Sequence, residues 1–284
     1  MHEQLITLND AFNNFIDAGE TQSQAHIKLL HWHIAERLVI GGGFNPDDIV
    51  PRPPLRVETT GKGKSHRSRL VHDPTVAVPG ERTILGGLKT KDVDVVISKD
   101  GVGPCIAISV KGTLSAFRNL TNRMEEAAGD CTNIHISYPN LIYGFFHVIK
   151  ANHASNTKRR NDVAIESNEE VVAGIVRYHD AIARLTGRKD VRNDVSRYEA
   201  VALAMVDASP DSRGHILQSF PTRDSPIRFE QFFDAIYRIY DLRYVYTAPA
   251  LRRTTARSSW SEDSPASSAS GADAFNFRFA PPSD

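Results

Sequence analysis

The chain has 284 residues, of which 40% are hydrophobic, so it is long enough to bury the core of one large domain. Its 34 basic and 34 acidic residues give a net charge of zero, which excludes a global field that draws the whole protein onto nucleic acid. Only Cys105 and Cys131 are present, which excludes a disulfide framework and a cysteine-rich zinc site.

The apolar runs and the N-terminus bear on location. The longest apolar runs are far shorter than the roughly 20 residues that cross a bilayer. The first residues also lack the basic-then-apolar order of a signal peptide. We therefore expect a soluble, cytoplasmic protein without a membrane partner.

The first 90 residues combine a helix with a long loop region. An amphipathic helix is predicted near 22–40, ending at Gly41-Gly42-Gly43. Its apolar stripe, at spacings of three and four, consists of Ile27, Leu30, Ile34 and Leu38. Residues 43–90 are rich in Pro, Gly, Thr and basic side chains and have weak periodicity, which predicts a long ordered excursion. Because loops of this kind often contact ligands, region 1–90 is a candidate binding region.

The region 91–250 alternates strands and helices, as an α/β core does. A strand over 93–98, a strand over 105–111 and a helix over 114–128 come first. Short strands follow near 133–138 and 142–150. We expect a mixed central β-sheet flanked by helices, with residues 1–90 as an N-terminal helical and loop extension.

Three more elements are predicted in the second half of this core. Ser167 and Glu170 form a capping-box pattern, and Gly187 follows an apolar stripe, so a helix is expected between them. Residues 198–207 are apolar on both faces, as expected of a central strand covered on both sides. A last helix is predicted over 227–243.

The C-terminal residues have a different composition. After about Thr254 the chain is rich in Ser, Ala, Asp and Pro and has few large apolar side chains. It therefore offers little burial to offset the entropy of ordering. We expect residues 251–284 to form a flexible tail without a catalytic role.

The strand predicted over 105–111 ends with two polar residues on one face. Because side chains alternate along a strand, Ser109 and Lys111 share a face and Val110 points to the other. An ammonium group at the end of a buried strand is costly unless an anion lies nearby. Asp94 on the adjacent hairpin strand is the obvious partner, although Asp92 lies on the same strand face and could exchange roles with it.

The helix predicted over 114–128 offers a second carboxylate. Its expected stripe leaves Glu126 nearly opposite the core and Glu125 at the margin, so Glu125 is the better-placed ligand and Glu126 the alternative. That stripe consists of Phe117, Leu120, Met124 and Ala128.

These residue types suit magnesium chemistry on a phosphodiester. Magnesium takes one or two protein carboxylates and keeps several waters, which fits Asp94 with Glu125 and a phosphate. Lys111 would stabilise charge on the attacked phosphate or orient the attacking water.

Together the residues resemble the active-site signature of the PD-(D/E)XK nuclease superfamily and, within it, the Type II restriction endonucleases. The usual signature is an aspartate that opens a strand, followed by acid-x-lysine at the end of the next strand. In one branch, whose members recognise CCGG or CCNGG cores, serine or a similar residue replaces the first acid of that pair, and the following helix supplies the carboxylate. Asp94, Ser109-Val110-Lys111 and Glu125 resemble that migrated pattern, because Glu125 lies fourteen positions after Lys111.

The resemblance implies a role for each residue and for the whole chain. Asp94 and Glu125 would bind Mg²⁺, Lys111 would be the catalytic lysine, and Ser109 would occupy the vacated acid position. The chain would then be a Type II restriction endonuclease that hydrolyses both strands of a specific double-stranded DNA site. Palindromic sites favour a two-fold protein, so a homodimer or a higher even oligomer is expected.

Two departures from the family pattern leave the target sequence open. Val93 stands where the family has a proline, although that proline is often missing. The branch places an Arg-(Asp/Glu)-Arg reading motif soon after the lysine, whereas this chain has Arg118-Asn119 and Arg123 there.

Two groups of side chains are candidates for DNA contact. Side chains that donate hydrogen bonds near the active-site helix could reach base edges. This group consists of Arg118, Asn119, Asn122 and Arg123. Basic side chains of the Pro- and Gly-rich loop are expected to grip phosphate, which positions a duplex without reading it. This second group includes Lys62, Lys64 and Arg67.

Two alternative functions use the same residues. A DNA repair nuclease or junction resolvase keeps the fold but changes the DNA substrate. A non-catalytic DNA-binding protein would use Asp94 and Lys111 as a structural ion pair.

Two other local patterns resemble ligand-binding motifs but lack a residue or a spacing that the motif needs. Gly63-Lys64-Ser65 lacks the glycine of a phosphate-binding loop, because Glu58 occupies that position. His31 and His33 are two residues apart, so on a helix they face different ways and cannot form the usual metal pair.

Overall fold

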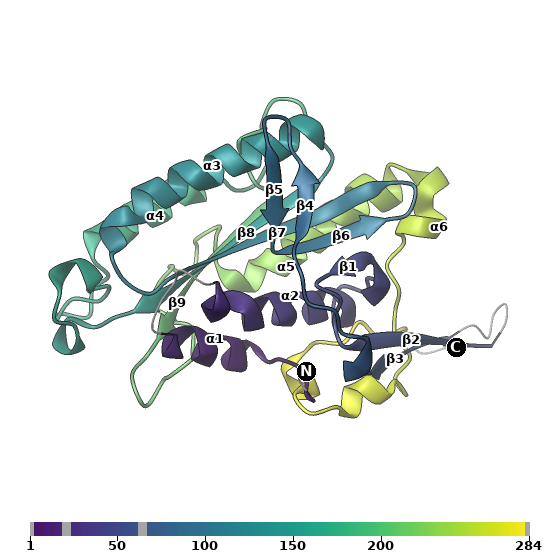
Figure 1. Cartoon of the computed structure of the whole chain (residues 1–284), viewed down its shortest axis with the longest axis horizontal. Helices are drawn as coiled ribbons and strands as arrows, with labels where there is room; N and C mark the ends of the chain where they lie inside the picture. Colours follow the sequence, from purple (N-terminus) through teal and green to yellow (C-terminus); the bar gives the residue numbers. More distant parts are fainter. Residues whose placement is uncertain (1–2, 19–23, 62–66, 282–284) are drawn as a thin grey trace.

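A five-stranded sheet forms the centre of the computed structural model, which describes residues 3–18, 24–61 and 67–281 (Figure 1). Its strand order is β1-β6-β7-β8-β9. The strands are β1 (Ile49–Val50), β6 (Val95–Lys99), β7 (Gly103–Thr113), β8 (Ile142–Ala151) and β9 (Ala200–Asp207). The β1–β6 and β6–β7 pairs are antiparallel, whereas β8 and β9 run parallel to β7. The sheet is therefore mixed, and the predicted α/β class is confirmed.

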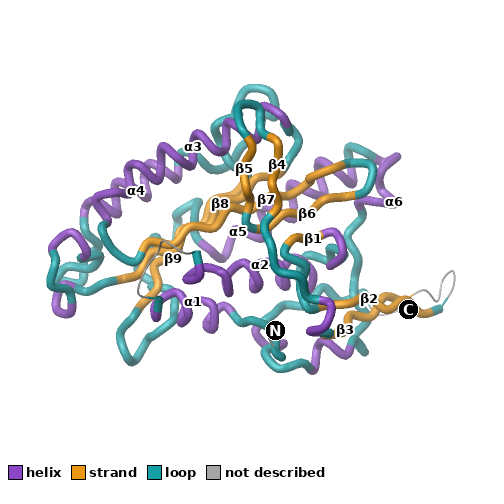
Figure 2. The backbone as a smooth tube through the Cα atoms, viewed as in Figure 1, coloured by secondary structure: helices purple, strands orange, loops and turns teal. Residues whose placement is uncertain are grey.

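Helices cover both faces of this sheet, as Figure 2 shows. One face packs on α1 (Leu8–Asp17), α2 (Lys28–Ile40) and α5 (Phe229–Tyr240), and the other on α3 (Leu120–Ser137) and α4 (Ala173–Ala183). Strand β7 serves both cores, since Ile108 and Val110 belong to the first and Ala107 to the second. Among the helices that the structure describes, none is both long and apolar enough to cross a membrane.

The helix after β7 starts later and runs further than predicted. Ala116 has a φ of 55°, and a 3₁₀ turn over Phe117–Asn119 precedes α3. The prediction of a strand near 133–138 is wrong, because α3 continues to Ser137. Cys131 and Ile134 are buried at helical spacing, so burial against the sheet extends the helix. The next strand, β8, falls where 142–150 was predicted.

After β1, which joins the main sheet, the excursion predicted over 43–90 forms two hairpins outside that sheet. They are β2 (Leu55–Thr60) with β3 (Arg67–His72), and β4 (Arg82–Leu85) with β5 (Thr90–Val93). The turn of the second hairpin rests on α3, because the Asn133 Oδ1 atom accepts hydrogen bonds of 2.8 Å and 3.0 Å from the backbone N–H groups of Leu88 and Lys89. This hairpin leads directly into β6.

Three later elements show where the predictions were right and wrong. Helix α4 begins at Ala173, after the predicted capping-box pair, because Glu169 has a φ of 63°, which is not helical. Strand β9 is buried on both faces as predicted, but it is the last strand of the order rather than a central one. Isolated bridges from Ile216 and Arg228 help to cover it. The last predicted helix is present as α5, followed by a π-helical turn over Asp241–Tyr246.

The C-terminal segment packs against the core, so the prediction of a flexible tail is wrong. After the short helix α6 (Arg252–Thr255), Trp260 is fully buried, and its indole N–H lies 3.0 Å from the carbonyl oxygens of both Val39 and Ile40. Phe275 is buried as well. Composition misled because a few apolar side chains in this segment meet a core surface on α2, which lies 221 residues earlier in the chain.

Candidate active site

Asp94 lies where the chain passes from the β4–β5 hairpin into β6, and its side chain is buried. Pairing of β6 with β7 begins at Val95, opposite Ile108. One residue earlier, the Asp94 Oδ2 atom accepts a hydrogen bond of 2.7 Å from the backbone N–H of Val110. The carboxylate thus satisfies an amide at the point where the strands diverge, and this bond holds it beside the end of β7.

Ser109 and Lys111 point to the face of β7 that α3 covers, as the strand alternation predicts. Ser109 is buried, and its hydroxyl oxygen lies 2.8 Å from the hydroxyl oxygen of Tyr143 on β8. Lys111 is half-buried and reaches α3, where its Nζ atom lies 3.9 Å from Oε1 of Glu126. Ser109 is therefore an interior residue, and Lys111 lies where the buried interior meets the solvent-exposed surface, at the rim of the core.

Glu126, rather than Glu125, is the acidic side chain that α3 presents to Lys111. Glu126 also accepts a hydrogen bond of 2.8 Å from the Nη1 atom of Arg123. Glu125 is exposed and takes part in no ion pair with any residue that the structure describes. Of the two acids weighed from the sequence, the structure brings Glu126 to the site.

The orientation of the buried face of α3 explains why Glu126, and not the predicted Glu125, lies beside Lys111. The predicted stripe began at Phe117, but Phe117 belongs to the preceding 3₁₀ turn. Within α3, Ala127 is buried and Ala128 is only half-buried. Successive helical residues are about 100° apart, so Glu126 lies about 100° from the direction of Ala127 and Glu125 about 200° from it. The residue nearer to the buried face is therefore Glu126.

Asp92, the alternative to Asp94, is occupied in the β4–β5 hairpin. Its Oδ1 atom accepts a hydrogen bond of 2.5 Å from the hydroxyl of Thr83, the residue opposite it in the register. Lys91 forms an ion pair of 2.5 Å with the buried Asp130 of α3. The structure thus brings Asp94, and not Asp92, to the end of β7.

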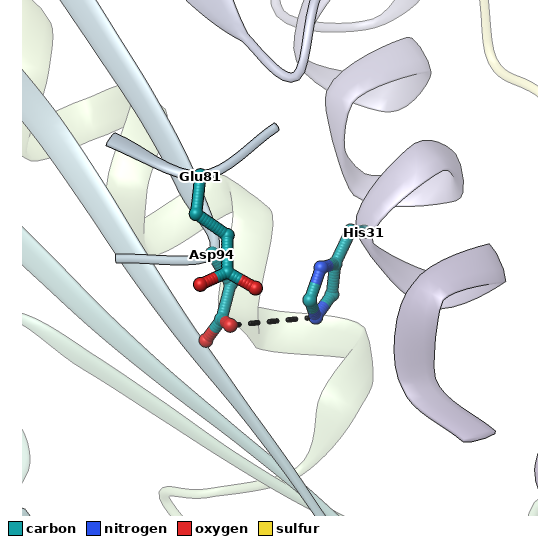
Figure 3. A group of neighbouring side chains, drawn as sticks. All are labelled: His31, Glu81 and Asp94. Atoms are coloured by element: carbon teal, nitrogen blue, oxygen red, sulfur yellow. Dashed lines mark ion pairs between the residues drawn. The ribbon is translucent and has the colours of Figure 1, made fainter. Parts of the chain in front are cut away.

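Two further side chains with metal-ligating atoms converge on Asp94 (Figure 3). His31 points from α2, and its Nε2 atom lies 3.5 Å from Oδ1 of Asp94. Glu81 is the residue just before β4. One ligand atom from each of His31, Glu81 and Asp94 lies within 4.8 Å of the other two. Neither residue was expected from the sequence, where His31 is a candidate only as a pair with His33. No local spacing signals this group, since only the fold joins its members.

Burial determines the charge states in this group. Desolvation raises the pKa of Asp94, although the Val110 amide and the Lys111 ammonium favour the carboxylate. Desolvation also lowers the pKa of His31 to about 4, so the imidazole is neutral near pH 7. The Nε2 atom of His31 has no hydrogen-bond partner among the described residues. A neutral imidazole and two carboxyl groups form a donor set for a divalent ion.

The electrostatics of Glu126 differ from those of Asp94. Burial opposes its ionisation, but the hydrogen bond from Arg123 and the charge of Lys111 outweigh that effect and lower its pKa. Glu126 is therefore anionic near pH 7, which keeps a negative charge beside Lys111.

A cavity gives access to the His31 and Glu81 side of the site. Its volume is about 310 Å³, and its lining includes Lys28, His31, Trp32 and Glu81. Lys28 and Lys111 both lie close enough to disfavour protonation of His31. The opening therefore combines the ligand atoms of His31 and Glu81 with the ammonium group of Lys28, a cation that suits the binding of a phosphate.

The predicted base-contacting residues surround the start of α3. Arg118 and Asn119 belong to the 3₁₀ turn and Asn122 and Arg123 to the first turn of α3, and all four are exposed. A cavity of about 120 Å³ lies beside them, and Gly112, the residue after Lys111, contributes to its lining.

The predicted phosphate-gripping loop belongs to the β2–β3 hairpin. Arg67 is exposed at the start of β3. Lys62 and Lys64 lie outside the described residues.

Comparison with protein-family models and with curated proteins found no match to this chain.

Proposed function

We propose that the chain is a Mg²⁺-dependent endodeoxyribonuclease of the Type II restriction class, which hydrolyses both strands of a specific double-stranded DNA site. The observation that carries the proposal is that an aspartate, a lysine and a glutamate lie around the end of β7. Asp94 is anchored to the Val110 amide, and Lys111 lies 3.9 Å from Glu126. These are the residue types that metal-dependent phosphodiester hydrolysis requires.

The donor atoms present fit a divalent cation. Asp94 lies with His31 and Glu81, whose ligand atoms are all within 4.8 Å of one another, while Glu126 lies on the side of α3 beside Lys111. The unpaired ring nitrogen of the buried His31 supports a ligand at this point, because a buried polar atom without a partner is costly. A bound divalent ion supplies a Lewis acid for the phosphate and lowers the pKa of a bound water. Asp94, His31 and Glu81 would hold it, and Glu126, in place of Glu125, would be the acid beside Lys111.

Lys111 acts on the reacting phosphate in this proposal. Its half-buried ammonium stands at the rim, where it can stabilise negative charge on the attacked phosphate or orient the attacking water. Glu126, 3.9 Å away, attracts that ammonium toward α3.

Ser109 has a structural role that suits the migrated pattern. Its hydroxyl is buried against the Tyr143 hydroxyl, so it faces the interior of the sheet rather than solvent. A carboxylate at this position would be buried beside the Tyr143 hydroxyl, away from solvent, where a charge is costly. The acid on α3 then replaces the acid that the strand lacks.

Double-stranded DNA is the proposed partner. The exposed Arg118, Asn119 and Asn122 beside Lys111 would reach base edges, while Arg123 is held by Glu126 and would have to exchange partners to do so. Cleavage of both strands of a palindrome requires two such sites, so a homodimer or a higher even oligomer is part of the proposal.

The test is digestion of a sequenced circular plasmid by the purified protein with Mg²⁺. We expect discrete fragments from the wild type and none from Asp94→Asn or Lys111→Ala, with each variant checked for folding by circular dichroism. Asp92→Asn is the matched control, because Asp92 bonds Thr83 instead, and it should cut like the wild type. Discrete cutting by both Asp94→Asn and Lys111→Ala would overturn the site.

The same assay separates the alternatives. Cleavage of branched but not of linear duplex DNA would indicate a junction resolvase or repair nuclease. DNA binding without cleavage at any Mg²⁺ or Mn²⁺ concentration would indicate a non-catalytic binding protein.

A further inference from the structure

A larger cavity lies away from the Asp94 site. It has a volume of about 530 Å³ and is formed where the end of α2, helix α5, the π-helical turn and the C-terminal segment meet. The side chains that matter for its chemistry are Arg37, Arg238, Arg257, Arg278, Asp241 and Tyr246. It shares no lining residue with the cavity beside His31 and Glu81. Figure 1 shows these elements on the face of the sheet opposite α3.

The lining carries more positive than negative charge. Its four arginines face two aspartates, Asp234 and Asp241. Asp241 is already neutralised by Arg257, whose Nε and Nη2 atoms bind its two carboxylate oxygens at 2.9 Å and 2.6 Å. Among the described residues, Arg37, Arg238 and Arg278 form no ion pair, so at least two positive charges are left without an opposing carboxylate in contact.

Arg37 and Arg278 are held in place by neutral groups. The Arg37 guanidinium lies over the ring of Phe233, 4.4 Å from its centroid. The Nε atom of Arg278 donates a hydrogen bond of 3.2 Å to the carbonyl oxygen of Ser258. Burial lowers the pKa of both arginines, which reflects the cost of keeping these cations out of water. An anion in the cavity would relieve that cost.

The geometry favours phosphate as the anion. Guanidinium groups present several N–H donors in a planar fork that matches phosphate oxygens. The volume lies within the range of roughly 300–1,000 Å³ that is typical of small-molecule sites. Tyr246, 70% exposed at this cavity, offers an aromatic face to a base.

We propose that this cavity is a phosphate-binding site, which takes the phosphate of a nucleotide or of a DNA backbone through Arg37, Arg238 and Arg278. Both ligands would bind through the same phosphate group. They differ in the rest of the molecule, which is a single nucleoside in one case and a DNA duplex in the other. The site is independent of the nuclease reaction, so its test needs no cleavage.

The experiment is isothermal titration calorimetry of the full chain in EDTA, with pyrophosphate, a deoxynucleoside 5′-monophosphate and a short DNA duplex as separate titrants. We expect Arg278→Gln and Arg238→Gln each to weaken binding about tenfold or more, because each removes a charge-assisted hydrogen bond. Arg37→Gln should act in the same direction. Since it also removes packing on Phe233, the exposed Arg238 is the decisive position if the Arg37 variant fails to fold.

Arg252→Gln is the matched control, because Arg252 is an exposed arginine on the nearby α6 that does not line the cavity. It should bind all titrants like the wild type. Loss of nucleotide binding alone in the cavity variants would assign a free nucleotide, and loss of duplex binding would assign the DNA backbone. Failure of every titrant to bind the wild type, or equal binding by the wild type and all cavity variants, would overturn the proposal. Neither result depends on whether the Asp94 site cuts DNA.

Discussion

The Nζ atom of Lys111 lies 3.9 Å from Oε1 of Glu126, whereas Glu125, one residue earlier, forms no ion pair with any described residue. The end of β7 and the second turn of α3 therefore meet through Glu126. This contact distinguishes Glu126 from Glu125 as the acid beside Lys111. Mutation of each glutamate therefore tests which of them α3 presents to the site.

The first prediction concerns that register. In the proposed site, Glu126→Gln should reduce plasmid cleavage on the order of 100-fold, because it removes the anion beside Lys111. Glu125→Gln is the matched control and should stay within about threefold of the wild type, since an exposed side chain away from the reacting groups contributes little. Initial cleavage rates at saturating Mg²⁺ measure both. Inactive Glu125→Gln with active Glu126→Gln would show that the DNA-bound helix has another register.

The second prediction concerns His31. Its Nε2 atom lies 3.5 Å from Asp94, so His31→Ala should weaken Mn²⁺ binding about tenfold, as expected when one donor of a metal site is lost. Binding is measured by calorimetry with Mn²⁺ and without DNA, so the result does not depend on activity. The exposed His215→Ala is the control. Unchanged Mn²⁺ affinity in His31→Ala and in Glu81→Gln would exclude this side of the site as a metal ligand set.

The third prediction concerns pH. His147 is buried between the hydroxyl groups of Thr113 and Tyr178, and burial lowers its pKa to about 3. A histidine whose folded pKa lies below the unfolded value of about 6.5 binds more protons in the unfolded chain, so the folded state loses stability as the pH falls from about 6.5 toward 3. This group alone should remove on the order of 2 kcal/mol of unfolding free energy between pH 6.5 and pH 4.5, at about 1.4 kcal/mol per pH unit with a discount for relaxation.

The measurement is urea unfolding at several pH values. His147→Asn should be less stable than the wild type at pH 7, because it loses packing, but its stability should fall less steeply below pH 6.5. His215→Asn should follow the wild-type slope, because His215 is exposed. Identical slopes for the wild type and His147→Asn would contradict the assignment of His147 as a neutral buried base.

The fourth prediction concerns the C-terminal segment. Trp260→Ala should lower the free energy of unfolding by about 3–5 kcal/mol, because it removes a fully buried indole and leaves the carbonyl oxygens of Val39 and Ile40 without its N–H donor. Arg253→Ala is the control, since its side chain is exposed. Chemical denaturation followed by circular dichroism measures both. A change below about 1 kcal/mol for Trp260→Ala would mean that this segment does not pack on α2 in solution.

Properties that depend on local geometry could be predicted from the sequence. The alternation of Ser109, Val110 and Lys111 follows from the two-residue period of a strand, and the structure keeps it, with Val110 in one core and Ser109 facing the other way. The same short-range patterns predict the α/β class and select Asp94 and Lys111 as candidate site residues.

The side chains that lie beside Asp94 and Lys111 could not be predicted in this way, because they come from distant parts of the chain. The register of α3 changed because the chain turns through Ala116 and a 3₁₀ turn before the helix begins, so Glu126 replaced Glu125. His31 reached Asp94 because α2 packs beside the start of β6, and Trp260 was buried because its partners lie on α2. These contacts join residues that are distant in the chain, and their free energy comes from burying surfaces that exist only after the sheet and helices have assembled.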